Sequence, residues 1–487
     1  MGHSVLIVEN EKKWRLLFEE GLRAKGYSVE SSKSWENAVE TLESNGGFDA
    51  LVLNLHFLSR RDYLAQNVLE SVVRCCPQTP CIIVSGYPDQ LIKNVGRYRD
   101  QVFELLWKGD DPQEFDLDVL FGTVESAIRQ RSPQTKPRHI TWLHISDLHL
   151  HPPDYGAHIV LKNLLRDVEE QMNSQSLKPD FIVVTGDTAH TGKARQYERA
   201  EGFLEKLRVL TGLSKSRLFI VPGNHDIDWV LIDDAFAAAC SKALVSKDAV
   251  DEMLDKPGEL RRILKKFRHY KRFVNTYLAN SAGNPLRPCD YNHLYFTETM
   301  NLANLPVSIL GLNSAWMSAY KWKPKKKKKD AVDRHNLLLG RRQLRDALAE
   351  VEPRVKKDEP HLVIAIMHHP TEWLKDGIDR EEVEALLEER CAFVLRGHLH
   401  DNKVVQFQTP GGEAVTITAG ASFKTRGGKL DYNGYNFVRL DLDKGEGTIY
   451  LRAYSQKGSE FWTDDVFSYP KTDGGRVSFK LPDFSSK

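Results

Sequence analysis

Between residues 140 and 397, short apolar runs end abruptly in polar residues, and this pattern limits the fold more than any other feature. Patterns typical of helices separate several of the runs, notably 158–174 and 195–210. Apolar strands that alternate with helices are typical of parallel sheets covered on both faces. We therefore expect an α/β fold with strands at ITWLHI (140–145), DFIVVTG (180–186), RLFIVPG (217–223), VSILGLN (307–313), HLVIAIM (361–367) and CAFVLRG (391–397).

Five of these runs are followed by side chains of the kinds that bind metals. The side chains are carboxylates, imidazoles and one amide: Asp147, His149, Asp187, Asn224, His368, His398 and His400. In open α/β sheets, ligands bind beyond the carboxyl ends of the strands. A single Gly-Asp is usually a turn, and a single His after a strand is usually structural. The conjunction at five strand ends instead favours a site for borderline divalent metals.

The first 130 residues form a separate pattern of short strands and amphipathic helices. We expect strands at 4–9, 27–31, 48–55, 80–87 and 103–109, and helices at 11–26, 34–47, 66–76 and 115–130. This alternation predicts a doubly wound parallel sheet. Residues 131–138 are polar with two prolines, so we expect a linker there and a second domain over 139–487. That domain is expected to carry a helical insertion at 229–280 and a β-rich part after residue 400.

Composition excludes little. Lys+Arg (68) and Asp+Glu (67) nearly cancel, so net charge alone predicts no polyanionic partner. The 6 cysteines lack zinc-ribbon spacing, and we expect reduced thiols. The first residues do not resemble a signal peptide, and no apolar run has the length needed to span a bilayer. We expect a cytoplasmic protein without a membrane partner.

Five motifs in order carry a family resemblance. D-x-H (147–149), GD (186–187), GNHD (223–226), His368 and GHLH (397–400) resemble the calcineurin-like metallophosphoesterase superfamily over about 139–455. The resemblance implies a four-layer α/β/β/α sandwich with two divalent metal ions, such as manganese, iron or zinc. It implies that one metal is held by Asp147, His149 and His400, the other by Asn224, His368 and His398, and that Asp187 bridges them. His369 stays open as an alternative to His368.

The resemblance also implies a mechanism. Two metals lower the pKa of a shared water, and the resulting metal-activated hydroxide attacks phosphorus. His225 would give a proton to the leaving oxygen, and Asp226 would orient or charge that imidazole. Arg396 is a weaker candidate for contact with the substrate phosphate, because it would equally well pair with an acidic neighbour. No role is assigned to His144, His151, His190 and His369, for which a structural role is the plainer expectation.

The motifs also bear on substrate class. GDTAHTG lacks the Asp-Arg pair of phosphoprotein phosphatases, and the motifs look closer to class III cyclic-nucleotide phosphodiesterases and DNA-repair nucleases. Two basic segments, 261–272 and 321–329, would steer a nucleotide or nucleic acid, or would be a solvated helix and a mobile loop. We expect a dimetal phosphoesterase that hydrolyses phosphodiester bonds of nucleotides or nucleic acid. A phosphomonoesterase and a signalling adaptor with a vestigial site are the alternatives.

The strand ends of the first domain resemble those of a response-regulator receiver domain. The positions concerned are Glu9, Asn10, Asn54, Ser85 and Lys108. Ser85 and Lys108 match the receiver pattern, but Asn54 stands at the phosphoacceptor position, and an amide is a poor nucleophile toward phosphate. The resemblance therefore implies a pseudo-receiver that is not phosphorylated and that docks a protein partner or regulates the chain. A plain α/β scaffold is the alternative.

Overall fold

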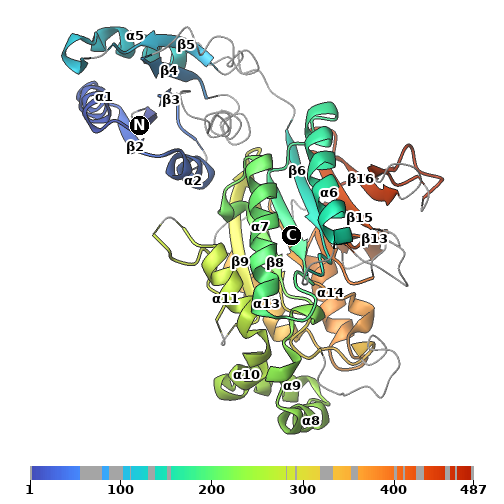
Figure 1. Ribbon diagram of the computed structural model, residues 1–487. Helices are drawn as coiled ribbons and strands as arrows, with labels where there is room; N and C mark the ends of the chain where they lie inside the picture. Colours follow the sequence, from blue (N-terminus) through green and yellow to red (C-terminus); the bar gives the residue numbers. More distant parts are fainter. Residues whose placement is uncertain are drawn as a thin grey trace. The chain divides into compact units, whose positions relative to one another are not determined.

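The computed structural model describes two compact units. The greater part of the first is Met1–Arg138, and the second begins at His139. Figure 1 draws both units. Of the predicted linker, only Arg138 is among the described residues, which are 3–45, 47–54, 79–86, 102–109, 111–129, 138–150, 155–280, 282–290, 293–318, 333–352, 360–399, 403–409, 412–423, 433–455, 461–466 and 469–483.

The first unit contains a parallel sheet in the order β2-β1-β3-β4-β5. This order is that of flavodoxin-like folds, so the predicted fold class is confirmed for this unit. Helix α1 packs on the sheet because Trp14, Phe18 and Leu22, spaced four residues apart, form one buried stripe. The strands are β1 Ser4–Val8, β2 Ser28–Ser32, β3 Ala50–Leu53, β4 Cys81–Ser85 and β5 Val102–Trp107, and the helices are α1 Lys12–Ala24, α2 Trp35–Asn45, η2 Pro112–Glu114 and α5 Leu117–Arg129.

The second unit contains two sheets. One has the order β17-β16-β15-β6-β7-β8, with β18 beside β16, and the other has the order β13-β14-β12-β11-β10-β9. The strands are β6 His139–Ile145, β7 Phe181–Thr185, β8 Leu218–Val221, β9 Tyr295–Leu302, β10 Leu305–Leu312, β11 Leu362–Ile366, β12 Phe393–Arg396, β13 Lys403–Thr409, β14 Gly412–Thr418, β15 Gly434–Asp441, β16 Glu446–Ser455, β17 Phe461–Asp464 and β18 Arg476–Lys480. All six predicted apolar runs are strands, and the part after residue 400 is β-rich.

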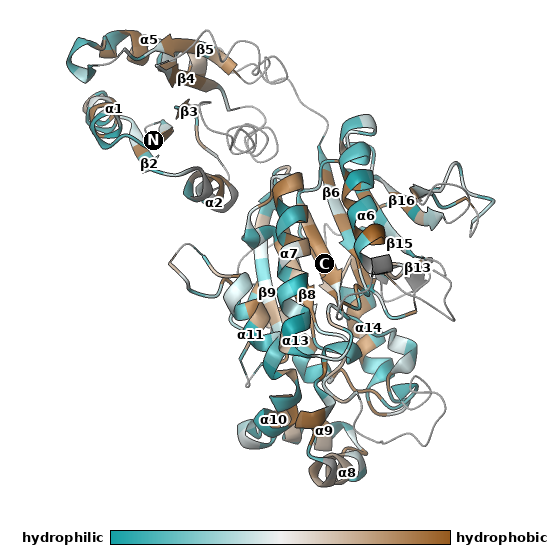
Figure 2. Ribbon diagram, in the orientation of Figure 1, coloured by the Kyte–Doolittle hydropathy of each residue, from teal (hydrophilic) through white to brown (hydrophobic). Residues whose placement is uncertain are grey.

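The inner faces of the two sheets pack on each other, and helices cover the outer faces. Trp142 on β6 meets Phe393 on β12 with ring centroids 5.3 Å apart, which joins the two sheets through their apolar side chains. Leu344 of α13 and Leu387 of α14 pack into the core of the second sheet. Figure 2 shows apolar residues along β6 and β8 and hydrophilic ones over much of α7. The predicted four-layer arrangement is confirmed, with helices α6 Tyr155–Ser174, α7 Ala194–Thr211, α13 Arg341–Val351 and α14 Arg380–Arg390.

Short helices fill the predicted insertion at 229–280. They are η5 Trp229–Leu231, α8 Asp234–Ala243, α9 Lys247–Leu254, α10 Pro257–Leu264, η6 Lys265–Phe267 and α11 Arg268–Tyr277. Helices α8, α9 and α10 gather at one end of the unit (Figure 1). Helix α11 instead packs along α7, where the rings of Tyr197 and Phe273 stack at 5.1 Å. The insertion thus carries α11 back to the body of the unit.

No helix among the described residues combines the length and apolar character required to cross a membrane. The described cysteines are free thiols, namely Cys81, Cys240, Cys289 and Cys391, while Cys75 and Cys76 lie outside the described residues.

Candidate active site

The carboxyl ends of the parallel strands of one sheet lie against those of the other sheet. The predicted ligand residues directly follow these strand ends. The strands concerned are parallel, so within each sheet their carboxyl ends share one edge. Hydrogen bonds join the two edges. His368 Nδ1 donates to the Thr185 carbonyl oxygen at 2.6 Å, and the His398 backbone N–H donates to Asp147 Oδ2 at 3.1 Å. His400 lies outside the described residues.

Four predicted ligand residues hold backbone conformations that side-chain-bearing residues rarely adopt. The angle φ is +53° at Asp147, +44° at His149, +52° at Asp187 and +69° at His398. Such left-handed conformations cost about 1–3 kcal/mol each and persist only where the surrounding structure fixes them. Such strain occurs after three different strands. It indicates that the backbone there adopts a conformation that positions these side chains, at a cost in stability.

The glycines of the GD and GNHD motifs are required because neighbouring side chains lie too close to them for a Cβ atom to fit. A Cβ atom on Gly186, whose φ is +93°, would lie 2.5 Å from His368 Nδ1. A Cβ atom on Gly223 would lie 2.1 Å from Asp187 Oδ1. Real Cβ atoms do not approach so closely, so each glycine lets a strand end lie against a predicted ligand.

Ligand-type atoms converge around Nε2 of His368. This atom lies 3.1 Å from Asn224 Oδ1, 3.3 Å from Asp187 Oδ2 and 3.2 Å from His398 Nδ1. Because Nδ1 of His368 donates to the Thr185 carbonyl oxygen, Nε2 carries the lone pair of the neutral ring. The Asn224 and Asp187 oxygens also present lone pairs. A neutral ring therefore faces two acceptors, and either a proton on Nε2 or a cation among these atoms resolves that conflict.

Asp187 has the surroundings of a metal ligand. It is fully buried, and its Oδ1 accepts the His225 backbone N–H at 2.8 Å. No hydrogen-bond donor reaches its Oδ2 among the described residues, which is costly for a buried carboxylate unless positive charge lies nearby. Although burial lowers the pKa of His368, the Asp187 carboxylate raises it to about 9. The site attracts positive charge, and its mixed oxygen and nitrogen donors fit divalent metals.

A second group of donors lies beside the first. One ring nitrogen each of His149, His190 and His225 lies within 4.8 Å of the others. His149 Nε2 is also 3.6 Å from Asp147 Oδ1 and 4.0 Å from Asp187 Oδ2, so it lies between the two groups. The assignment of ligands to two metals stays a prediction, since the predicted third ligand on the His149 side lies outside the described residues.

His190 belongs to this second group, although no role was predicted for it. Its backbone N–H donates to the Leu150 carbonyl oxygen at 3.1 Å, and Leu150 forms a β-bridge with Ala189. The bridge pairs the segments that follow β6 and β7, and this pairing brings His190 toward His149. The only feature of the sequence that could have indicated a role for His190 is the polar stretch GDTAH directly after β7.

His225 is half-buried, and its ring is oriented by a backbone carbonyl. Its Nδ1 donates to the His190 carbonyl oxygen at 2.7 Å, which leaves Nε2 to meet a substrate. The ring centroid lies 4.6 Å from that of His149. The imidazole therefore lies beside His149 in the second group of donors.

Asp226 does not make the contact that the sequence suggested. Its carboxylate accepts N–H groups of Gly223 at 3.0 Å and Ala189 at 2.9 Å, together with the Tyr197 hydroxyl at 3.0 Å. Burial, and after it the Asp187 carboxylate, raises the pKa of Asp226 to about 6. Asp226 thus connects the segment after β7 with the segment after β8. The His225 ring instead donates its hydrogen bond to the His190 carbonyl oxygen.

Arg396 is a structural residue in this structure. Only 2% of it is exposed, and its guanidinium pairs with both carboxylate oxygens of Glu372 at 2.7 and 3.3 Å and donates to Thr418 Oγ1 at 3.2 Å. Of the two alternatives from the sequence, the acidic neighbour is the one that the structure favours.

His369 is fully buried behind His368. Its Nδ1 lies 3.0 Å from Ser314 Oγ, and no hydrogen-bond partner reaches its Nε2 among the described residues. A ring nitrogen of His369 lies within 4.8 Å of donors on both His368 and His398. His368 is the residue of the pair that contacts Asn224 and Asp187.

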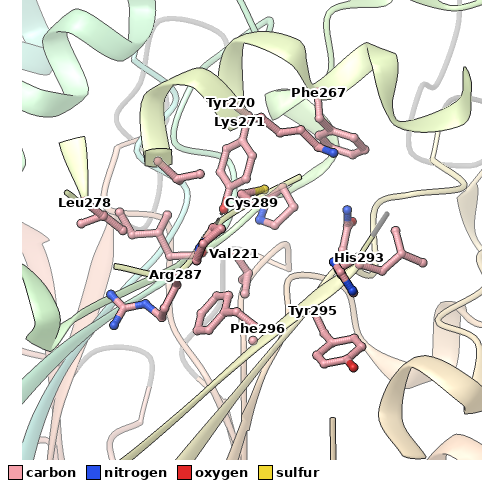
Figure 3. A pocket seen from close by; sticks show the side chains of 17 residues that line it. Val221, Phe267, Tyr270, Lys271, Leu278, Arg287, Cys289, His293, Tyr295 and Phe296 are labelled. Atoms are coloured by element: carbon pink, nitrogen blue, oxygen red, sulfur yellow. Dashed lines mark hydrogen bonds between the residues drawn. The ribbon is translucent and has the colours of Figure 1, made fainter. Parts of the chain in front are cut away.

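An apolar pocket adjoins the strand that leads to Asn224. Its wall includes Pro222, two residues before Asn224, and the rings of Tyr270 and Phe296, which Figure 3 shows around one hollow. The hollow has a volume of ≈ 50 Å³. Its aromatic walls are of the kind against which planar rings stack.

The basic segment 261–272 is largely an amphipathic helical face. Lys266 and Lys271 are buried, and their ammonium groups donate to the carbonyl oxygens of Ser318 and Asp290. Burial lowers the pKa of Lys271 to about 8. Arg268 and other basic residues of the segment are exposed. The segment 321–329 lies outside the described residues.

In the first unit, the predicted receiver-like residues gather at the carboxyl edge of the sheet. Asn54 Nδ2 donates to Glu9 Oε1 at 2.8 Å and to Asn10 Oδ1 at 3.1 Å. The Lys108 ammonium donates to Glu9 Oε2 at 3.1 Å, and the Lys108 backbone N–H donates to the Ser85 carbonyl oxygen. Lys108 and Asn54 therefore satisfy both oxygens of the buried Glu9 carboxylate.

A family model matches most of the second unit. The model, described as calcineurin-like phosphoesterase, matches residues 140–402. This range contains the described residues that converge around His368 and those of the second group.

Two curated proteins are similar to parts of the chain. The "Uncharacterized metallophosphoesterase-like protein YydB" of Bacillus subtilis (strain 168) is 25% identical over 347 residues, covering 70% of this chain and 65% of that protein. The "cAMP/cGMP dual specificity phosphodiesterase MT0825" of Mycobacterium tuberculosis (strain CDC 1551 / Oshkosh) is 40% identical over 87 residues, covering 17% of this chain and 26% of that protein. The chain thus spans less than two thirds of the length of each.

Among solved structures, a response regulator receiver domain protein from Clostridium thermocellum shares 19% sequence identity, covering 26% of this chain and 96% of its own, with a TM-score of 0.22. The flavodoxin-like fold of the first unit rests on its strand order and not on this likeness. For the second unit, the match to the family model extends over more than half of the chain. The chain belongs to the calcineurin-like phosphoesterase family.

Proposed function

We propose that this chain hydrolyses phosphodiester bonds of nucleotides or nucleic acid with two divalent metal ions. The observation that carries the proposal is the convergence of Asn224, Asp187 and His398 around Nε2 of His368. His149 Nε2 lies 3.6 Å from Asp147 Oδ1 and 4.0 Å from Asp187 Oδ2, and Asp147 and His149, with His400, would hold the second ion. When bound, two such ions lower the pKa of a shared water and neutralise charge on phosphate oxygens.

The residues of the chain supply the rest of the reaction. Water adds to phosphorus while the bond from phosphorus to the leaving oxygen breaks. His225, held through Nδ1 by the His190 carbonyl oxygen, presents Nε2 and gives a proton to that oxygen. Asp226 holds the loop of His225 through Gly223 and Tyr197.

Two observations support a nucleotide substrate. The apolar pocket beside Pro222 has aromatic walls that suit a nucleobase. The name of MT0825 describes a cyclic-nucleotide phosphodiesterase, which accords with hydrolysis of a diester in this chain.

We propose a regulatory or docking role for the first unit. Asn54 stands where a receiver domain takes its phosphoryl group, and its amide is bonded to Glu9 and Asn10. Lys108 is also paired with Glu9, so the polar side chains of Asn54, Glu9 and Lys108 have hydrogen-bond partners without a phosphoryl group. The unit then acts on a protein partner in one fixed state.

The test is metal analysis followed by a substrate comparison. We expect about two divalent ions per chain, and hydrolysis of bis(p-nitrophenyl) phosphate that is lost with a chelator and restored by manganese, iron or zinc. Faster turnover of p-nitrophenyl phosphate would instead identify a phosphomonoesterase. Protein that binds no metal and hydrolyses neither compound would identify an adaptor with a vestigial site.

A further inference from the structure

We propose that a groove beside His225 holds a second phosphate group of the substrate, on the leaving-group side of the scissile bond. The preferred substrate is then a linear oligonucleotide, because a cyclic mononucleotide has one phosphate. This inference rests on the phosphodiesterase function proposed above and names the substrate class of the same site.

The groove is large and open, with a volume of ≈ 610 Å³. Its walls come from the segments after β7 and β8, the first turn of α7 and the insertion helix α11. They include His190, Lys193, Arg195, Asp228 and His269. A volume of this size accommodates a nucleotide-sized group, and an open channel lets a strand pass through.

The lining is built to hold an anion. Asp228 is 3% exposed, and its carboxylate lies 2.5 Å from Lys193 Nζ and 3.4 Å from His269 Nε2. The carboxylate therefore anchors Lys193, whose side chain remains 46% exposed. Arg195 is exposed and makes no ion pair with any other described residue, so its guanidinium adds an uncompensated positive charge. Arginine and lysine pair with phosphate through charge-assisted hydrogen bonds.

The groove begins at the residue that orients the proton donor. His190 lines it, and the carbonyl oxygen of the same residue accepts from His225 Nδ1 at 2.7 Å. The ring centroids of His190 and His225 are 5.4 Å apart. Because His225 protonates the leaving oxygen, the leaving group lies over His225 and its continuation enters the groove. In an oligonucleotide, that continuation carries the next phosphate.

The experiment compares three dinucleotides on the full chain loaded with manganese. They are thymidylyl-(3′→5′)-thymidine and the same compound with a phosphate on its 5′ or its 3′ hydroxyl, and cleavage of the internal bond is followed by chromatography. We expect one terminal phosphate to raise kcat/KM about tenfold or more. In Arg195→Gln that preference falls toward one, and Arg195→Lys restores part of it. Lys206→Gln, an exposed change on the same helix away from the groove, keeps the preference.

Three outcomes would overturn the inference. Equal kcat/KM for all three dinucleotides in the wild type would mean that no second phosphate is bound. A preference that survives unchanged in both Arg195→Gln and Lys193→Gln would place the second phosphate elsewhere. Faster hydrolysis of 3′,5′-cyclic nucleotides than of any dinucleotide would contradict the linear substrate. Each of these leaves hydrolysis of bis(p-nitrophenyl) phosphate in place, whereas loss of that activity as well would overturn the proposed function itself.

Discussion

Nε2 of His368 lies 3.1 Å from Oδ1 of Asn224, although the two residues are 144 positions apart and follow strands of different sheets. In the neutral ring of His368 the proton is committed to the Thr185 carbonyl oxygen, and this contact then sets two lone pairs against each other. A cation between the sheets, or a second proton on the ring, makes the contact favourable. The proposed metal site and the packing of the two sheets therefore depend on one another.

Asp187→Asn should remove metal and activity together. The change removes the negative charge and one oxygen ligand at the point where both groups of donors meet, with Oδ2 of Asp187 3.3 Å from His368 Nε2 and 4.0 Å from His149 Nε2. We expect metal content below two per chain, and a fall in kcat for bis(p-nitrophenyl) phosphate of about 10³-fold, because metal stabilisation of the transition state is worth several kcal/mol. Asp346→Asn, an exposed change on α13, is the matched control. Full activity of Asp187→Asn would refute the assignment.

His225→Ala should keep both metals and lose proton donation. We expect kcat to fall about 10²–10⁴-fold for a methyl or thymidine leaving group, whose oxygen needs a proton. The fall should be much smaller for p-nitrophenolate, which departs without one. Metal analysis and the dependence of kcat on the leaving group measure the two effects. An equal fall for both leaving groups, or lost metal, would point to a ligand role for His225.

Gly186→Ala should weaken metal binding although it replaces no proposed ligand. The new Cβ atom would lie 2.5 Å from His368 Nδ1 and would displace that ring from its carbonyl partner. Changes to such supporting contacts typically cost about 10–100-fold in metal affinity. Competition with a chelating dye measures the affinity. Gly202→Ala on α7, where a Cβ meets nothing within 4 Å, should leave it unchanged, and unchanged affinity in Gly186→Ala would argue against the close approach.

Asp379 should make the second unit less stable as pH rises. Its buried carboxylate accepts the backbone N–H groups of Leu339 and Gly340, but burial raises its pKa from 3.8 to about 6. The folded chain therefore binds a proton more tightly than the unfolded chain between these values. The contribution of this group falls by on the order of 3 kcal/mol as pH rises through that window.

Urea unfolding of the wild type and of Asp379→Asn at pH 4.5 and pH 7.5 checks this prediction. The asparagine does not titrate, so the stability of the wild type relative to the variant should decrease at the higher pH. A relative stability that is constant or increases would contradict the raised pKa.

The first unit should not take up a phosphoryl group. Asn54 donates to Glu9 and Asn10, and its amide is not nucleophilic. Incubation of the wild type with acetyl phosphate and magnesium should leave the intact mass unchanged. In Asn54→Asp, a second carboxylate faces the buried Glu9, and we expect a loss of stability that magnesium reverses, because hard oxygen ligands bind it. An acid-labile adduct on the wild-type unit would contradict the pseudo-receiver interpretation.

Local pattern was sufficient for most of the fold. The predicted strand 180–186 is β7 Phe181–Thr185, and the predicted helix 195–210 is α7 Ala194–Thr211. Apolar runs and helical periodicity depend only on neighbouring residues, and for that reason they can be read along the chain. The position of the candidate ligand residues after strand ends was predictable for the same reason.

Partners of individual side chains were not predictable in this way. Asp226 lies next to His225 in sequence, yet it bonds to Gly223, Ala189 and Tyr197, while His225 bonds to the His190 carbonyl oxygen. Arg396 likewise forms an ion pair with Glu372, which is distant in sequence. A side chain's partner depends on how the loops fold over the sheet edge, and adjacency in sequence carries no information about that.

The sequence by itself determined that this chain carries strand-end carboxylates, imidazoles and an amide in the order of a metallophosphoesterase. Only the tertiary structure decided that the edges of two sheets meet at Asp187 and His368, that His190 joins the site, and that Lys193 and Arg195 line a groove beside His225. The physical reason is that the identity of a ligand is a local property of the chain. Its neighbours are set by the packing of sheets and loops from distant segments.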